Sequence, residues 1–191
     1  MLSSTNFSQA LLYRAHHKGI NLCNLKLQKL AYYCQGYYLA THNEPLFHDA
    51  INAWQHGPVV PTLYHSFCGY GDRHIPVPAQ DHFSSLAQSA KEMIDFIIDK
   101  YGRAGAWTLR NNTHNESPWL AHYDRDSGRI DKAEITHQEL KSFFLNELAE
   151  IQDKQLAKLL DQYQEASTKP PVAMPDTISS SKDFLQWIRN R

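Results

Sequence analysis

The stretch NLKLQKLAYYCQGYYLA, residues 24–40, decides the fold of this chain. Its apolar side chains recur at the three-and-four spacing of one helical face and then continue around the cylinder. They are Leu27, Leu30, Ala31, Cys34 and Tyr38 on the first face, with Tyr33, Tyr37 and Leu39 beside them. A helix that is apolar on more than one side belongs inside a domain. We therefore predict a central, buried helix here, capped by Asn24.

Helical spacing continues on both sides of this segment. It predicts a first helix capped by Ser4 or Thr5 and ending near His17, and further helices over residues 58–69, 85–101 and 104–111 with a turn over 118–122. The helix over 85–101 would begin after Ser84 or Ser85, and the helix over 58–69 would begin at Pro58, whose ring suits a first helical turn. Thr136 and Glu139 form a capping box. The helix that they begin either runs long or breaks near Gln152.

These elements define a mainly α fold class. We expect a single compact helical domain over residues 1–150, with a small β-hairpin near residues 45–56. A C-terminal helical extension follows, in which residues 151–191 comprise the helix end, a Pro-rich linker and an amphipathic C-terminal tail.

The composition fits a folded intracellular protein without a polyanionic partner. Apolar residues make up 42% of the 191 residues and charged residues 20%, which is too apolar for a disordered chain. The 19 basic residues balance 20 acidic ones, so nucleic acid is not the expected partner. The sequence has neither a bilayer-spanning apolar segment nor a leader pattern, and its three cysteines form no disulfide framework. We expect a cytoplasmic location and no membrane association.

The sequence lacks the common catalytic and phosphate-binding motifs, so we expect no catalytic, metal or cofactor-binding residues. His65 and Cys68 lie one helical turn apart, yet a zinc site needs further ligands, and packing is the better interpretation. Burial of Cys34 would keep its thiol inert. The sequences around His114, Glu116 and His122 leave a hydrolase open as an alternative function.

Four motifs appear in a fixed order along the chain: KLQKLAYY at residues 26–33, AWQHGPVV at 53–60 followed by Tyr64, YG at 70–71, and THNESPW at 113–119. Together they resemble the Panacea domain, a SocA-like, phage-associated family of antitoxins, over about residues 8–148. The resemblance implies a mostly helical domain that neutralises a toxin, often one that stops translation, as part of a type II-like toxin–antitoxin system. It also implies a cognate protein toxin as the partner, commonly encoded by the adjacent gene.

The family motif positions in this chain are Trp54, Gly57, Pro58, Val59, Tyr64, His114, Pro118 and Trp119. Physically, Gly57 permits a tight turn and the two tryptophans can hold loops against the central helix. These residues are therefore expected to be structural first, with contact to a partner left open.

Toxin specificity is expected outside the motifs. Trp187 and Phe184 stand beyond the Pro-rich linker on a short amphipathic segment that needs something to pack against, and Tyr70 opens the 69–83 loop. We take these three as candidate toxin-binding residues. A proteolytic adaptor that delivers the toxin to a protease, a promoter-binding regulator and a homo-oligomer remain open as alternatives.

Overall fold

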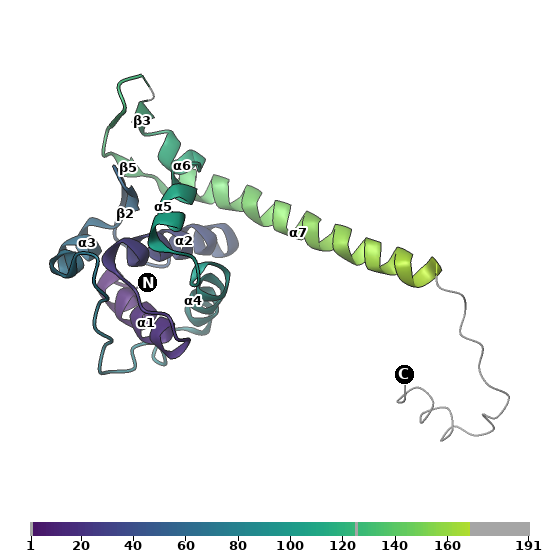
Figure 1. Cartoon of the computed structure of the whole chain (residues 1–191), viewed down its shortest axis with the longest axis horizontal. Coiled ribbons are helices and arrows are strands. Elements are labelled where there is room, and N and C mark those ends of the chain that lie inside the picture. Colours follow the sequence, from purple (N-terminus) through teal and green to yellow (C-terminus); the bar gives the residue numbers. More distant parts are fainter. Residues whose placement is uncertain (1, 125, 169–191) are drawn as a thin grey trace. The chain divides into compact units, whose positions relative to one another are not determined.

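A computed structural model of the chain describes residues 2–124 and 126–168, and this part is mainly helical (Figure 1). The helices are α1 (Ser4–His17), α2 (Asn24–His42), α3 (Pro61–Phe67), the 3-10 turn η1 (Cys68–Tyr70), α4 (Gln88–Tyr101), α5 (Ala106–Thr113), α6 (Ser117–Leu120) and α7 (His137–Thr168). The strands are β1 (Ile51–Trp54), β2 (Gly57–Val59), β3 (Tyr123–Asp124), β4 (Arg129–Ile130) and β5 (Glu134–Ile135). The mainly α fold class is confirmed.

The chain divides into two units, Met1–Ala149 and Glu150–Arg191. Of the second unit, the structure describes the remainder of α7. The predicted linker and tail, with Phe184 and Trp187, lie outside the described residues. No helix in the described ranges is both long and apolar enough to cross a membrane.

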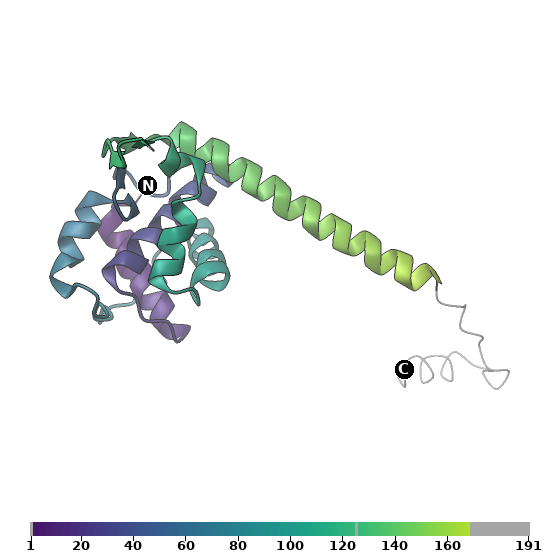
Figure 2. The same cartoon turned by 45° about the horizontal axis from the view of Figure 1, so that its top comes forward.

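Helix α2 is the centre of the first unit, as its sequence predicts. Leu27, Leu30, Ala31 and Cys34 are fully buried, and α1, α3, α4 and α5 all pack against it (Figure 2). The predicted cap is wrong, because Cys23 occupies the N-cap position. Asn24 is the first helical residue, and its buried side chain donates instead to the carbonyl oxygen of Tyr64.

The predicted hairpin is present but lies a few residues further along the chain. Strand β1 pairs antiparallel with β2, with Trp54 opposite Gly57, and with β5 on its other edge, which gives the sheet order β2-β1-β5. Pro58 lies within β2, so our prediction that it starts a helix is wrong. The helix begins at Pro61, since the backbone N–H that proline lacks is not needed in the first turn.

The capping box at α7 is confirmed. The backbone N–H of Glu139 donates to Thr136 Oγ1 at 3.2 Å, and that of Thr136 donates to Glu139 Oε2 at 2.7 Å. The helix then runs unbroken past Gln152, which settles the predicted alternatives in favour of the long form. Its first turns close the core, because Leu140 and Phe144 are fully buried.

Two other helix starts differ from their predictions. Ser3, rather than Ser4 or Thr5, caps α1 by accepting from the backbone N–H of Asn6. Helix α4 begins at Gln88, because Ser84 is held in a preceding turn by Asp81.

Candidate functional site

A buried lysine joins the first motif to the second. Lys29 is fully buried on α2, and its Nζ donates to the carbonyl oxygen of Pro58 at 2.7 Å. Burial holds the pKa of Lys29 well below its usual value, and the positive charge of Arg110 lowers it further. Gly57 has a φ of +92°, and a Cβ there would lie 2.8 Å from Lys29 Nζ and 2.6 Å from Thr113 Oγ1. Only glycine fits at position 57, which is the physical reason for a glycine in the second motif.

A carboxylate clamp joins the first motif to the third. Tyr32 and Tyr33 on α2 donate their hydroxyls to Oε2 and Oε1 of Glu116, each at 2.8 Å. Burial raises the pKa of Glu116, and the two tyrosine hydroxyls oppose that rise by stabilising the carboxylate. Both oxygens of Glu116 are thus engaged with α2, which fixes the start of α6.

Trp119 joins the third motif to the second. Its ring is almost fully buried, and its Nε1 donates to the carbonyl oxygen of Trp54 at 2.9 Å. The His114 ring stacks on Trp119 with centroids 3.7 Å apart, and the Tyr123 ring stacks on it at 5.0 Å. Burial, followed by the charges of Arg110 and Lys29, lowers the pKa of His114 to about 4.

The motif residues therefore lie together around the N-terminal half of α2, although they are separated widely in sequence. Most of them serve to hold the β1–β2 hairpin and the α5–α6 segment against that helix. Pro118 and Val59 are buried with them. Tyr64 differs, because its side chain on α3 remains 37% exposed.

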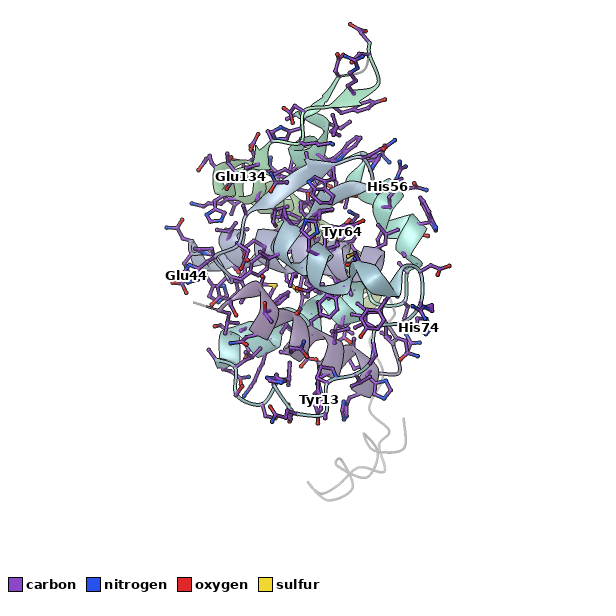
Figure 3. The ribbon with its side chains drawn as sticks, turned by 90° about the vertical axis from the view of Figure 1, so that its left-hand side faces the viewer. Tyr13, Glu44, His56, Tyr64, His74 and Glu134 are labelled. Atoms are coloured by element: carbon purple, nitrogen blue, oxygen red, sulfur yellow. The ribbon has the colours of Figure 1, made fainter. Side chains whose placement is uncertain are left out.

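Tyr64 belongs to a cavity that we call the aromatic groove, defined by Trp54, Tyr64 and Trp107 together with Leu25 and Val59. It has a volume of about 560 Å³. The Trp54 and Tyr64 rings meet edge to face with centroids 5.0 Å apart, and His56 meets Trp107 in the same way at 5.7 Å. Figure 3 shows His56 and Tyr64 on the same face of the molecule. Trp107 is 61% exposed, the most of any large apolar side chain among the residues for which burial is described.

A second cavity, of about 780 Å³, adjoins the aromatic groove and has a more polar lining. We call it the basic pocket, because the formally charged residues that line it are Arg110, Arg129 and Lys132. His114 and Trp119 contribute its aromatic wall, and Gln55 and Lys132 line both cavities.

Of the candidate toxin-binding residues, Tyr70 lies in the part of the chain that the structure describes. Tyr70 ends the turn η1 and packs partly against the core, while Cys68 and Gly71 beside it line the aromatic groove. The 69–83 loop is fixed to the N-terminal side of α2, because the backbone N–H of Ile75 donates to the carbonyl oxygen of Leu22 at 2.8 Å.

The three residues of the hydrolase alternative have separate partners. Glu116 faces the tyrosines of α2, and His114 stacks on Trp119, whereas His122 lies 3.1 Å from Asp131 and 3.6 Å from Glu139. In the part of the chain that the structure describes, no three His, Cys, Asp or Glu side chains are grouped to hold a metal ion. Burial raises the pKa of Cys34 far above its usual value, which favours the inert thiol that we predict.

Sequence reasoning found Trp54, Tyr64 and Trp119 but missed Trp107 in the aromatic groove and the three cations of the basic pocket. Trp107 has a signal that could have found it, because the buried side of α5 consists of Leu109 and Thr113, and Trp107 is off that side. No sequence pattern marks the three cations of the basic pocket, Arg110, Arg129 and Lys132. They come from α5, β4 and the segment before β5, which are separate parts of the chain.

Comparison with known proteins agrees with the resemblance in the motifs. Residues 27–120 match the family described as "Antitoxin SocA-like, Panacea domain", a narrower range than the 8–148 that we infer from the sequence. This part of the chain is therefore similar to the Panacea domain of the SocA-like antitoxins. Among curated proteins the chain is similar to Antitoxin SocA of Caulobacter vibrioides (strain NA1000 / CB15N), with 32% identity over 120 residues. That alignment covers 57% of this chain and 64% of the relative, so the chain spans less than two thirds of the relative's length. No solved structure matches the chain.

Proposed function

We propose that this protein is an antitoxin that neutralises a cognate protein toxin by binding it directly at the aromatic groove. The observation that carries the proposal is the exposure of Trp107 and Tyr64 at the rim of a preformed apolar cavity in a domain similar to the Panacea domain. Large aromatic side chains dominate the energetic centres of protein interfaces, because they bury much area with few rotatable bonds. The partner is thus expected to place an apolar segment in this groove.

Two hydrogen bonds behind the aromatic groove hold its strands in place, which supports tight binding. Trp54 is held by the hydrogen bond from Trp119, and the paired strand β2 is held by the hydrogen bond from Lys29 to Pro58. A surface that is already ordered loses little conformational entropy on binding, so more of the contact energy appears as affinity. Inhibition then follows from occupancy: the bound antitoxin covers the active site or substrate entrance of the toxin.

The proposal extends to the toxin itself and to where the two proteins meet. We expect the toxin to be encoded by the adjacent gene, to act on translation and to meet the antitoxin in the cytoplasm. The C-terminal tail, with Phe184 and Trp187, is proposed as a second contact that adds specificity to the shared groove.

The test is binding of the purified chain to the protein encoded by the adjacent gene, followed by rescue of cells that express that protein. We expect a stoichiometric complex, and we expect Trp107→Ala to weaken it by at least about tenfold, as for an interface hot spot. Phe96→Ala is the matched control, because Phe96 is also a large exposed aromatic, 40% accessible, and does not line the groove.

The possible results separate the two parts of the proposal. Absence of any complex with the adjacent protein, together with no rescue, would contradict the antitoxin function. A complex of unchanged affinity with Trp107→Ala and with Tyr64→Ala would place docking elsewhere on the molecule.

A further inference from the structure

The basic pocket holds cationic groups that no carboxylate of the described residues neutralises, although Arg110 Nη1 donates to Asn111 Oδ1 at 3.1 Å. In the described part of the chain, none of Arg110, Arg129 and Lys132 takes part in an ion pair. Arg110 Nε and His114 Nε2 are buried atoms that have no hydrogen-bond partner. Buried polar groups are nearly always hydrogen-bonded in folded proteins, and both of these atoms belong to residues that line the basic pocket, which indicates a missing ligand there. Since the charged groups around them are cationic, that ligand is an anion.

The backbone at the entrance supports the same conclusion. Lys132 has a φ of +58°, a left-handed conformation that is unfavourable for a residue with a long side chain. Asn52 Nδ2 donates to the carbonyl oxygen of Lys132 at 3.1 Å. The backbone N–H of Ala53 donates to the carbonyl oxygen of Ala133 at 2.9 Å. Strand β1 therefore holds this segment in place and keeps Lys132 where the two cavities meet. Such retained strain is commonly found at binding sites.

We propose that the basic pocket receives the carboxylate of an aspartate or glutamate side chain of the bound partner protein, next to the apolar segment that fills the aromatic groove. This inference rests on the proposed function and adds the chemistry of its partner. Arg110 and Arg129 each offer a planar fork of N–H donors that matches a carboxylate, and Lys132 adds a third positive charge. The partner segment is thus apolar with an acidic residue beside it.

A carboxylate fits this site better than the phosphates of a nucleic acid. Binding to nucleic acid requires an extended basic surface, because several phosphates must be neutralised at once. Here the cations line one cavity, whereas Asp124, Asp131 and Glu134 lie on the adjoining strands and turn, and the whole chain carries a net charge of −1. A single anionic group can enter the pocket, while a continuous polyanion would meet these acids.

The first test is affinity for the protein encoded by the adjacent gene. Arg129→Gln and Arg110→Gln should each weaken the complex by at least about tenfold, because each removes a charged partner from a desolvated pair. Arg103→Gln is the matched control, since Arg103 is exposed and lines neither cavity. Arg129 is itself exposed on β4, so its substitution should leave the melting temperature unchanged. If Trp107→Ala weakens the complex and both arginine variants bind like the wild type, the carboxylate proposal is wrong and the antitoxin proposal stands.

The second test needs no toxin. The full chain is titrated with the peptide acetyl-Ala-Glu-Ala-amide and with its Gln counterpart, while NMR follows Arg110 Nε and His114 Nε2. We expect the Glu peptide to shift both signals and the Gln peptide to leave them unmoved. Equal effects of the two peptides, or no effect of either, would overturn the proposal. Tighter binding of a 12-nucleotide single-stranded DNA than of the Glu peptide, at physiological salt, would assign the pocket to nucleic acid instead.

Discussion

At the residue scale, the close fit of α7 on α2 depends on one glycine. A Cβ on Gly36 would lie 2.0 Å from Cε2 of Phe144. That ring cannot move aside easily, because it is fully buried and packs on Tyr37 with centroids 4.6 Å apart. Gly36 is therefore the point at which the first turns of α7 reach the central helix.

Gly36→Ala should destabilise the protein by about 1–3 kcal/mol, since an overpacked core costs more than the helix propensity gained from alanine. The free energy of unfolding in urea measures this effect. Gly69→Ala serves as the control, because nothing lies within 4 Å of a Cβ at that position. Equal stability of the two variants would contradict the packing argument.

His114 should make stability depend on pH. Burial, with the nearby charges of Arg110 and Lys29, lowers its pKa from 6.5 to about 4 in the folded protein. Between these two pH values the unfolded chain binds more protons at this residue, so His114 contributes stability above pH 6.5 that is lost as the pH falls toward 4. Urea unfolding at pH 7 and pH 5 should show a smaller loss for His114→Gln than for the wild type. The same loss in both proteins would refute the low pKa.

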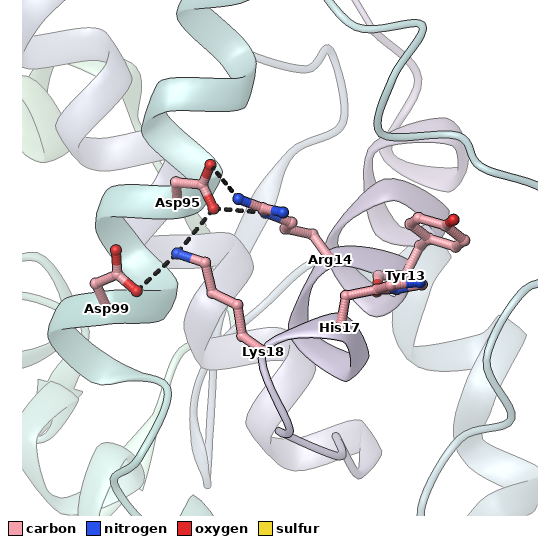
Figure 4. Close-up of polar contacts among 6 residues, drawn as sticks. All are labelled: Tyr13, Arg14, His17, Lys18, Asp95 and Asp99. Carbon is pink, nitrogen blue, oxygen red and sulfur yellow. Dashed lines mark hydrogen bonds and ion pairs between the residues drawn. The ribbon is translucent and has the colours of Figure 1, made fainter.

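At the element scale, an ion-pair cluster ties α1 to α4 (Figure 4). Arg14 binds Asp95 through two hydrogen bonds of 2.7 and 3.0 Å, and Lys18 reaches both Asp95 and Asp99. Burial alone would raise the pKa of Asp95, but the bonds from Arg14 and Lys18 outweigh it and hold that pKa below its usual value. Asp95 is thus the shared acceptor that orients the two helices.

Asp95→Asn should lower the free energy of unfolding by about 1 kcal/mol, the upper range for a partly exposed pair with two-point geometry. Asp99→Asn should cost less, because the Asp99 side chain is 68% exposed and accepts from Lys18 alone. Raising the salt concentration should narrow the difference between the two variants. A larger effect of Asp99→Asn would show that the two-point contact of Asp95 is not what joins the helices.

At the scale of the whole molecule, stability and specificity are expected to reside in different parts of the chain. The buried core is built from residues up to Phe144 among those described. The proposed second contact lies beyond Thr168, in a segment whose sequence places Phe184 and Trp187 after three prolines. Removing that segment should therefore affect binding and leave folding intact.

A chain that ends at Thr168 should keep the melting temperature of the full chain and bind the toxin several-fold more weakly, because it loses the two aromatic anchors. Calorimetry gives the first quantity and titration with the adjacent-gene product gives the second. The full-length variant with alanine at Phe184 and Trp187 should behave like the truncated chain. Wild-type affinity of both proteins would remove the tail from the proposed mechanism.

The sequence by itself determined the central helix, the start of α7, the fold class and the Panacea resemblance, because each depends on short-range spacing that the chain carries locally. Tertiary structure alone decided the burial of Lys29, the position of Pro58 in a strand and the meeting of Arg110, Arg129 and Lys132 in one pocket. A lysine ordinarily indicates an exposed position, so its burial cannot be read from its identity. A cavity forms where segments that are distant in sequence pack side by side. No periodicity along the chain predicts which segments these are.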